Sequence, residues 1–152
     1  MQIKSISSDN TEQIGIQIGE QLNGGEVIEL ISDLGGGKTT LTRGIAKGAG
    51  SHDDVASPTF TISRVYLAPK FEIHHFDFYR LDNAGIIAHE LEEAQTDKKI
   101  VTIIEWGDVV SDVLPKERLR IILSNETGDS EQRLITLHIP DSLAYATKGI
   151  TI

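Results

Sequence analysis

Eight consecutive residues, Ser32–Thr39 (SDLGGGKT), have the spacing of a phosphate-binding loop. The P-loop pattern G-x-x-x-x-G-K-[ST] is met at every position except the first, where Ser32 replaces glycine. The glycines at 35–37 let backbone N–H groups point at phosphate oxygens, and a helix that begins here adds the positive end of its dipole. Ser32 costs little if its backbone does not need a positive φ. The pattern predicts a nucleoside triphosphate site.

The side chains of the loop have separate predicted roles. Lys38 would neutralise the β and γ oxygens, and Thr39 would offer its hydroxyl to Mg²⁺, which prefers oxygen ligands and bridges the phosphates. The alternative is a glycine-rich turn followed by an exposed lysine. We favour the P-loop because the required strand and helix flank the motif. The candidate nucleotide-binding residues are Thr11, Asp33, Leu34, Gly35, Gly36, Gly37, Lys38, Thr39 and Thr40.

A carboxylate near the metal is expected at the end of the strand-like run Ile100–Glu105 (IVTIIE). An acid at the carboxyl end of a buried parallel strand is the Walker B arrangement, and ligands bind at this end of open α/β sheets. Glu105 is therefore the candidate metal ligand, beside Thr39, and a candidate catalytic residue, beside Lys38. The alternative is a glutamate solvated at a strand end.

A further acid and a loop complete the candidate site. In Phe71–Arg80 (FEIHHFDFYR), strand alternation places His75, Asp77 and Tyr79 on one face. A His75–Asp77 metal pair is disfavoured because Mg²⁺ avoids imidazole, so we assign Asp77 to catalysis as a water-orienting or outer-shell group. The segment Ser57-Pro58-Thr59 is a candidate switch segment that senses the γ-phosphate, or else a loop with a turn proline.

Strands and helices alternate around these residues. Helices are predicted over 8–21, 39–47, 83–94 and 108–113, and strands over 27–31, 59–66, 71–78, 100–104, 119–123 and 134–139. The strand pairs 59–66/71–78 and 119–123/134–139 read as hairpins. We predict an α/β fold of the P-loop NTPase-like, three-layer kind, with a mostly parallel central sheet, an antiparallel hairpin and helices on both faces. The segment after Pro140 is expected to fray or to dock weakly.

Composition narrows the function classes. A chain of 152 residues with 39% hydrophobic residues fits one P-loop domain over 1–152. With no cysteine, a disulfide framework and thiolate metal sites are excluded, and a reducing, cytoplasmic setting is expected without a membrane span. The net charge of -9 disfavours direct, sequence-specific nucleic-acid binding, so a protein partner or small ligand is expected.

Four motifs in order resemble the TsaE (YjeE) family. They are Ser32–Thr40 (SDLGGGKTT), Ser57–Phe60 (SPTF), His74–Leu81 (HHFDFYRL) and Ile103–Trp106 (IIEW), within a resemblance from about Asn10 to Leu123. Two positions depart from the family pattern, because Ser32 replaces the usual first glycine and Gly36 stands where alanine is common. Neither change removes a phosphate ligand.

The resemblance implies the ATPase component of bacterial N6-threonylcarbamoyladenosine synthesis on tRNAs that read codons starting with A. It implies ATP and Mg²⁺ as cofactors and the TsaB–TsaD complex as the protein partner. In that family, ATP hydrolysis is thought to reset TsaD between turnovers. The glutamate–tryptophan pair is linked to function in that family, so Trp106 is a candidate partner contact, with packing in the core as its alternative.

Other classes of protein use the same loop. A small-molecule P-loop kinase is the main alternative, although only Arg64 and Arg80 lie between the P-loop helix and Glu105, where such kinases carry an arginine-rich lid. A GTPase would need N-K-x-D to read guanine, and the nearest string, Thr96–Lys99 (TDKK), does not match. A nucleotide-binding module without catalysis also stays open.

Overall fold

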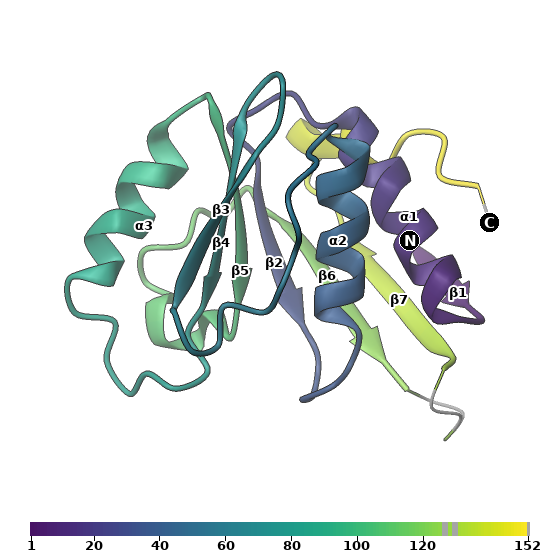
Figure 1. The fold of residues 1–152 in the computed structure, drawn as a ribbon, viewed down its shortest axis with the longest axis horizontal. Helices are drawn as coiled ribbons and strands as arrows, with labels where there is room; N and C mark the ends of the chain where they lie inside the picture. Colours follow the sequence, from purple (N-terminus) through teal and green to yellow (C-terminus); the bar gives the residue numbers. More distant parts are fainter. Residues whose placement is uncertain (126–127, 129–130, 152) are drawn as a thin grey trace.

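A computed structural model describes residues 1–125, 128 and 131–151. Its centre is a seven-stranded sheet in the order β1-β7-β6-β2-β5-β4-β3 (Figure 1). The strands are β1 (Gln2–Ser5), β2 (Val27–Ile31), β3 (Ser63–Leu67), β4 (Glu72–Asp77), β5 (Ile100–Glu105), β6 (Leu119–Ser124) and β7 (Arg133–His138). The four central strands β6, β2, β5 and β4 run parallel, and antiparallel strands complete both edges. The predicted α/β class is confirmed, with a mixed sheet.

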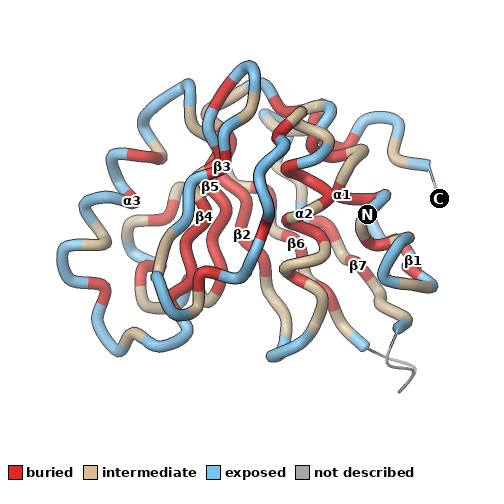
Figure 2. Tube along the Cα trace, in the orientation of Figure 1, coloured by how far each residue is buried: buried red, intermediate tan, exposed pale blue. Residues whose placement is uncertain are grey.

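Helices cover both faces of the sheet. On one face lie α1 (Ser8–Gln21) and α2 (Lys38–Gly48), and on the other lies α3 (Ile87–Thr96) (Figure 1). The strands that form the middle of the sheet are nearly continuous in buried apolar residues, as expected for strands covered on both faces (Figure 2). The layers are therefore helix, sheet, helix. The parallel strands all finish at the same end of the sheet.

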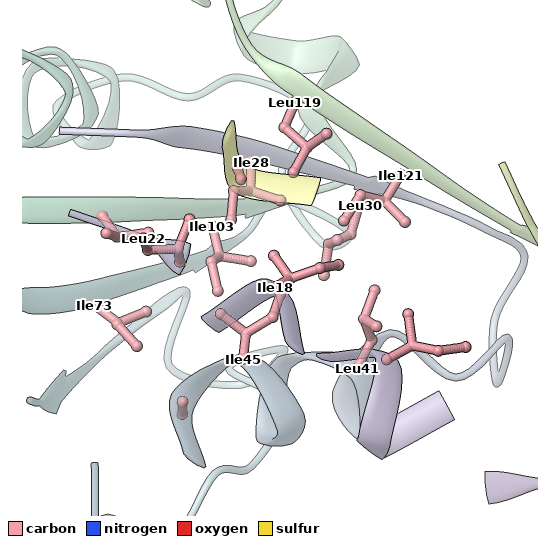
Figure 3. Close-up of a cluster of buried hydrophobic side chains, with 14 of the residues drawn as sticks. Ile18, Leu22, Ile28, Leu30, Leu41, Ile45, Ile73, Ile103, Leu119 and Ile121 are labelled. Carbon is pink, nitrogen blue, oxygen red and sulfur yellow. The ribbon is translucent and has the colours of Figure 1, made fainter. Parts of the chain in front are cut away.

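The larger core lies between the sheet and the α1–α2 pair. Figure 3 shows Ile18 and Ile45 of the two helices facing Ile28, Leu30 and Ile103 of the central strands. The helices approach closely because glycines line their contact: a Cβ added at Gly44 would lie 2.2 Å from the carbonyl oxygen of Glu12. Close packing fixes the axis of α2, and with it the loop that precedes this helix.

Several boundaries differ from the predictions for local reasons. β3 begins at Ser63 because residues 58–62 form a turn in which the carbonyl of Pro58 accepts from the amides of Thr61 and Ile62. α3 begins at Ile87 because Asn83 caps a turn through its side-chain bond to the amide of Gly85. The expected helix over 108–113 is a 3-10 helix, η1 (Gly107–Val110). The loop between β6 and β7 lies partly outside the described residues.

Both chain ends are more ordered than the sequence indicates. β1 has no predicted counterpart, and it pairs antiparallel with β7. The segment after Pro140 forms a 3-10 helix, η2 (Asp141–Thr147), which packs on α1. The hydroxyl of Tyr145 donates a 2.6 Å hydrogen bond to buried Glu26, and the side chain of Gln17 pairs with the backbone of Thr151. The tail is thus held by specific polar contacts.

Candidate functional site: a P-loop cavity with two buried acids

The P-loop connects β2 directly to α2, as the motif requires. Gly35 and Gly37 have φ values of 75° and 98°, which only glycine adopts without strain. Gly37 is the residue before α2, and its carbonyl accepts the Leu41 amide, so the loop ends where the helix hydrogen bonds begin. The free amides at this helix start face a site suited to an anion.

A cavity of about 240 Å³ opens at this helix start, at the carboxyl ends of β2, β4 and β5. It collects most of the predicted site: Leu34, Gly35, Gly36, Gly37, Lys38, Thr39, Thr40, Ser57, Thr59, Asp77, Glu105 and Trp106. Residues separated by more than 70 positions in the chain meet here because β5 runs parallel beside β2, and β4 runs parallel beside β5. The cavity therefore brings residues of all four predicted motifs to one place.

Lys38 is the cation of the cavity, and it is only 6% exposed. The alternative of a glycine turn followed by an exposed lysine is therefore wrong. Its ammonium donates to Oγ of Ser32 at 2.8 Å and to the carbonyls of Ser32 and Asp33 at 3.3 and 3.2 Å. Burial lowers the pKa of Lys38, and the nearby carboxylates of Glu105 and Asp77 oppose this effect. The ammonium thus shares the cavity with two acids, and a phosphate group would find its counter-charge there.

Glu105 and Asp77 lie on adjacent strands as direct register partners, and each is 3% exposed. The alternative of a solvated Glu105 is therefore wrong. Oε1 of Glu105 accepts a 2.8 Å hydrogen bond from Nε2 of His75. Asp77 instead accepts from the hydroxyl of Thr59 at 2.8 Å and from the amide of Tyr79 at 2.9 Å. Since His75 is fully buried and bonded to Glu105, the disfavoured His75–Asp77 metal pair gains no support from the geometry.

The oxygen ligands fit a divalent cation that arrives with a nucleotide. Thr39 and Glu105 line the same cavity, and hydroxyl and carboxylate oxygens are the donors that Mg²⁺ takes. Among the described residues, no group of three or more His, Asp or Glu side chains forms a ready-made metal cage. Mg²⁺ commonly takes one or two protein ligands and completes its coordination shell with phosphate oxygens and water, so Thr39 and Glu105 could hold it together with a nucleotide.

The predicted switch segment, Ser57–Thr59, contacts Asp77 through its hydroxyls. Oγ of Ser57 lies 2.7 Å from Oγ1 of Thr59 and 3.5 Å from Asp77. Pro58 is buried and is not among the residues that line the cavity. The exposed side chain of Asp33 does not line it either, so Asp33 contributes its backbone, whose carbonyl accepts from Lys38 and Gly36.

Trp106 lines the cavity and has an unusual backbone conformation. Its φ of 57° and ψ of 47° are left-handed, which is uncommon for a residue with a side chain and marks strain that the surroundings maintain. The ammonium of Lys38 lies 4.9 Å from the centroid of its ring, a cation–π distance, and the ring of Tyr79 lies at 4.9 Å on centroids. Trp106 is partly buried and packs against the core beneath α3, whereas its role as a partner contact stays a prediction.

A second cavity adjoins the first and contains a residue that sequence reasoning missed. Gly35, Gly37 and Thr40 line both cavities, and Ser8, Thr11, Glu131 and Arg133 line only the second. Arg133 donates from Nε to the carbonyl of Gly36 at 3.1 Å, although 97 positions separate them. Thr11 is 2% exposed, and its hydroxyl donates to the carbonyl of Ser7 at 3.2 Å and lies 2.7 Å from that of Ser5. Nothing local to Arg133 signals this placement, which depends on β6 lying beside β2 and β7 beside β6.

The fold and the site together define a P-loop nucleotide-binding protein. A family model, "Threonylcarbamoyl adenosine biosynthesis protein TsaE", matches residues 5–135. The chain belongs to the TsaE family, whose members are named for tRNA threonylcarbamoyladenosine biosynthesis.

Relatives from distant bacteria agree with this assignment. The TsaE protein of Bacillus subtilis is 33% identical over 135 residues, which is 86% of this chain and 81% of that protein. The TsaE protein of Streptomyces coelicolor is 36% identical over 132 residues, which is 82% of this chain and 87% of that protein. The crystal structure of YdiB from Bacillus subtilis superposes with a TM-score of 0.78 at 27% identity, covering 96% of this chain and 90% of that one.

Among the described residues, no helix has the length and apolar character needed to cross a membrane.

Proposed function

We propose that this chain binds Mg·ATP and hydrolyses it in support of N6-threonylcarbamoyladenosine formation on tRNA, acting on the TsaB–TsaD complex. The observation that carries the proposal is that buried Lys38 lines the P-loop cavity together with the two buried acids Glu105 and Asp77. A buried ammonium beside two carboxylates is arranged for an anion that arrives together with a cation, which is the form of Mg·ATP.

Each residue has a role in this proposal. The amides of the loop at 35–39 bind phosphate oxygens, and Lys38 moves from Ser32 to the β and γ oxygens. Thr39 and Glu105 hold Mg²⁺, which neutralises charge on the triphosphate when it is bound. Asp77 stays outside the metal shell and orients the attacking water together with Thr59, to which it is already hydrogen-bonded.

The nucleoside occupies the second cavity. The two cavities share Gly35, Gly37 and Thr40, so a nucleotide whose phosphates lie at the helix start extends past the loop toward Thr11 and Arg133. ATP is preferred over GTP because the chain lacks the guanine-reading motif N-K-x-D at its nearest string, Thr96–Lys99.

The proposal is tested by calorimetry of Mg·ATP binding and by phosphate release with and without a TsaB–TsaD complex. We expect Lys38→Ala to abolish productive binding, whereas Lys47→Ala, on the same helix but half-exposed and paired with Glu12, binds as the parent does. Glu105→Gln keeps nucleotide binding and loses most hydrolysis. Equal Mg·ATP affinity of Lys38→Ala and the parent would reject the P-loop assignment. Transfer of the γ-phosphate to a small acceptor, in place of release, would favour the kinase alternative.

A further inference from the structure

Three buried side chains on neighbouring strands form a hydrogen-bonded row that ends at Glu105. They are Tyr66 of β3, His75 of β4 and Glu105 of β5, which are 2%, 0% and 3% exposed. Oη of Tyr66 lies 3.3 Å from Nδ1 of His75, and Nε2 of His75 lies 2.8 Å from Oε1 of Glu105. A carboxylate only accepts hydrogen bonds, so Nε2–H of His75 donates to it. The catalytic roles proposed above use neither Tyr66 nor His75.

The other end of the row is the backbone next to the switch segment. The single hydroxyl proton of Tyr66 is shared between Nδ1 of His75 and the carbonyl oxygen of Ala56, the residue before Ser57, which lies 2.9 Å from Oη. The switch segment also contacts Asp77 directly through Thr59. Residues 56–59 are therefore joined to both acids of the site through separate contacts, one direct and one through Tyr66 and His75.

Because Tyr66, His75 and Glu105 are buried, their hydrogen bonds restrict the orientations of the three side chains. Hydrogen bonds are stronger in a low-dielectric interior, and a buried polar group that loses its partner carries the full cost of desolvation. Glu105 therefore keeps the orientation that satisfies His75, and His75 keeps the one that satisfies Tyr66. A displacement of Ala56 strains this row first at the hydroxyl of Tyr66.

We propose that His75 and Tyr66 are positioning residues that hold the Glu105 carboxylate in register with the switch segment. Movement of this segment when triphosphate binds then reaches Glu105 through Tyr66 and His75. This inference rests on the proposed function, because it assigns Glu105 to the nucleotide-bound metal. Tyr66 and His75 do not line the cavity, but in this inference they set the orientation of Glu105, the proposed metal ligand.

The test measures ATP affinity by calorimetry with Mg²⁺ and with a chelator, because the gain due to Mg²⁺ reports on Glu105. We expect His75→Leu to lower that gain by about tenfold, the size typical of lost outer-shell partners of metal ligands, with ATP affinity in chelator unchanged. His75→Gln, whose amide again offers a donor to Glu105, restores most of the gain. Tyr66→Phe, which keeps the ring and removes only the hydroxyl, lies between the parent and His75→Leu.

Controls separate this inference from the fold and from the proposed function. Tyr145→Phe removes another hydrogen-bonded phenol, on the tail, and keeps the parent's Mg²⁺ gain. Thermal melting of each variant identifies a folding loss, and in that case Tyr66→Phe carries the test because it leaves His75 and Glu105 in place. A parent with no Mg²⁺ gain would reject the proposed function. A parent with such a gain and a Tyr66→Phe variant that matches it, or a His75→Gln variant no better than His75→Leu, would overturn the positioning role.

Discussion

Nζ of Lys38 donates a 2.8 Å hydrogen bond to Oγ of Ser32, the residue that departs from the first glycine of the P-loop pattern. Two loop carbonyls, those of Ser32 and Asp33, hold the same ammonium at 3.3 and 3.2 Å. The lysine is therefore turned back onto its own loop. Triphosphate binding has to replace these contacts with phosphate oxygens.

Removal of the Ser32 hydroxyl should strengthen nucleotide binding. We expect Ser32→Ala and Ser32→Gly to raise Mg·ATP affinity by about fivefold, the equivalent of one net hydrogen bond of about 1 kcal/mol. Calorimetry on the two variants separates the causes, because Ala removes the hydroxyl alone and Gly also adds backbone freedom. A gain in the Gly variant only would assign the effect to flexibility, and equal affinities in all three proteins would contradict the competition.

Ser32 and Gly36 are the two departures from the family pattern. The side chain of Ser32 fills the space that a side chain at position 36 would need. A Cβ added at Gly36 would lie 2.4 Å from Oγ and 2.6 Å from Cβ of Ser32, and 2.9 Å from the carbonyl oxygen of Asp33. We therefore expect Gly36→Ala to weaken Mg·ATP binding in the parent and to be much better tolerated together with Ser32→Gly. A double-mutant cycle on binding should give a coupling energy of about 1 kcal/mol or more. Additive effects would show that the loop relaxes around the new methyl group.

Local sequence predicts the parts of the site that a single motif determines. The P-loop lies on one continuous strand–loop–helix unit, so its residues and their flanking elements follow from spacing alone. Glu105 follows because a buried strand that ends in an acid places this acid at the ligand-binding edge. The contribution of Arg133 could not be predicted, since it requires β7 to lie two places from β2 in the sheet.

The same limit applies to His75 and to the first strand. Strand alternation places His75 on the face of Asp77, but the register between β4 and β5 decides that it bonds Glu105. β1 has four residues, too few to show an alternating pattern, and it forms because β7 offers it an edge. Pairing between distant strands is a property of the whole sheet, and no local propensity encodes it.

Trp106 is expected to act in partner binding more than in nucleotide binding. Its ring contacts Lys38 and Tyr79, it lines the cavity, and its backbone is left-handed. We expect Trp106→Ala to keep Mg·ATP affinity within a fewfold of the parent and to weaken association with the TsaB–TsaD complex by about 2 kcal/mol, as an interface hot spot does. Trp106→Phe, which keeps a ring beside Lys38, should lose less.

Two measurements on the same Trp106 variants decide whether Trp106 contacts the TsaB–TsaD complex or only packs in the hydrophobic core. Binding to the complex is compared with thermal melting of the isolated protein. A fall in melting temperature with proportionate loss of all binding would assign Trp106 to the core beneath α3. Unchanged association of Trp106→Ala with the complex would remove the contact role.

The docking of the tail makes a prediction about alkaline stability. Burial, together with the hydrogen bond to Glu26, raises the pKa of Tyr145 from 10.0 to about 12. The unfolded chain therefore releases this proton near pH 10.0, and the folded chain holds it until about pH 12. Between these values the folded state binds more protons, so stability falls as pH rises. The contribution of the protonated phenol is fully present below pH 10.0 and is lost as pH rises through about 12.

Tyr145→Phe removes this titration, while Glu26 keeps its bonds to the amides of Asn23 and Gly24. We expect the variant to be less stable than the parent below pH 10.0 and to lose less stability than the parent between pH 10.0 and about 12. Urea denaturation across this range measures the difference, and Tyr79→Phe, which is remote from the contact, controls for loss of a phenol. Because both proteins keep Tyr66, its own raised pKa contributes equally and cancels in the comparison. Parallel stability curves for the parent and Tyr145→Phe would show that the tail does not hold this hydroxyl against Glu26 in solution.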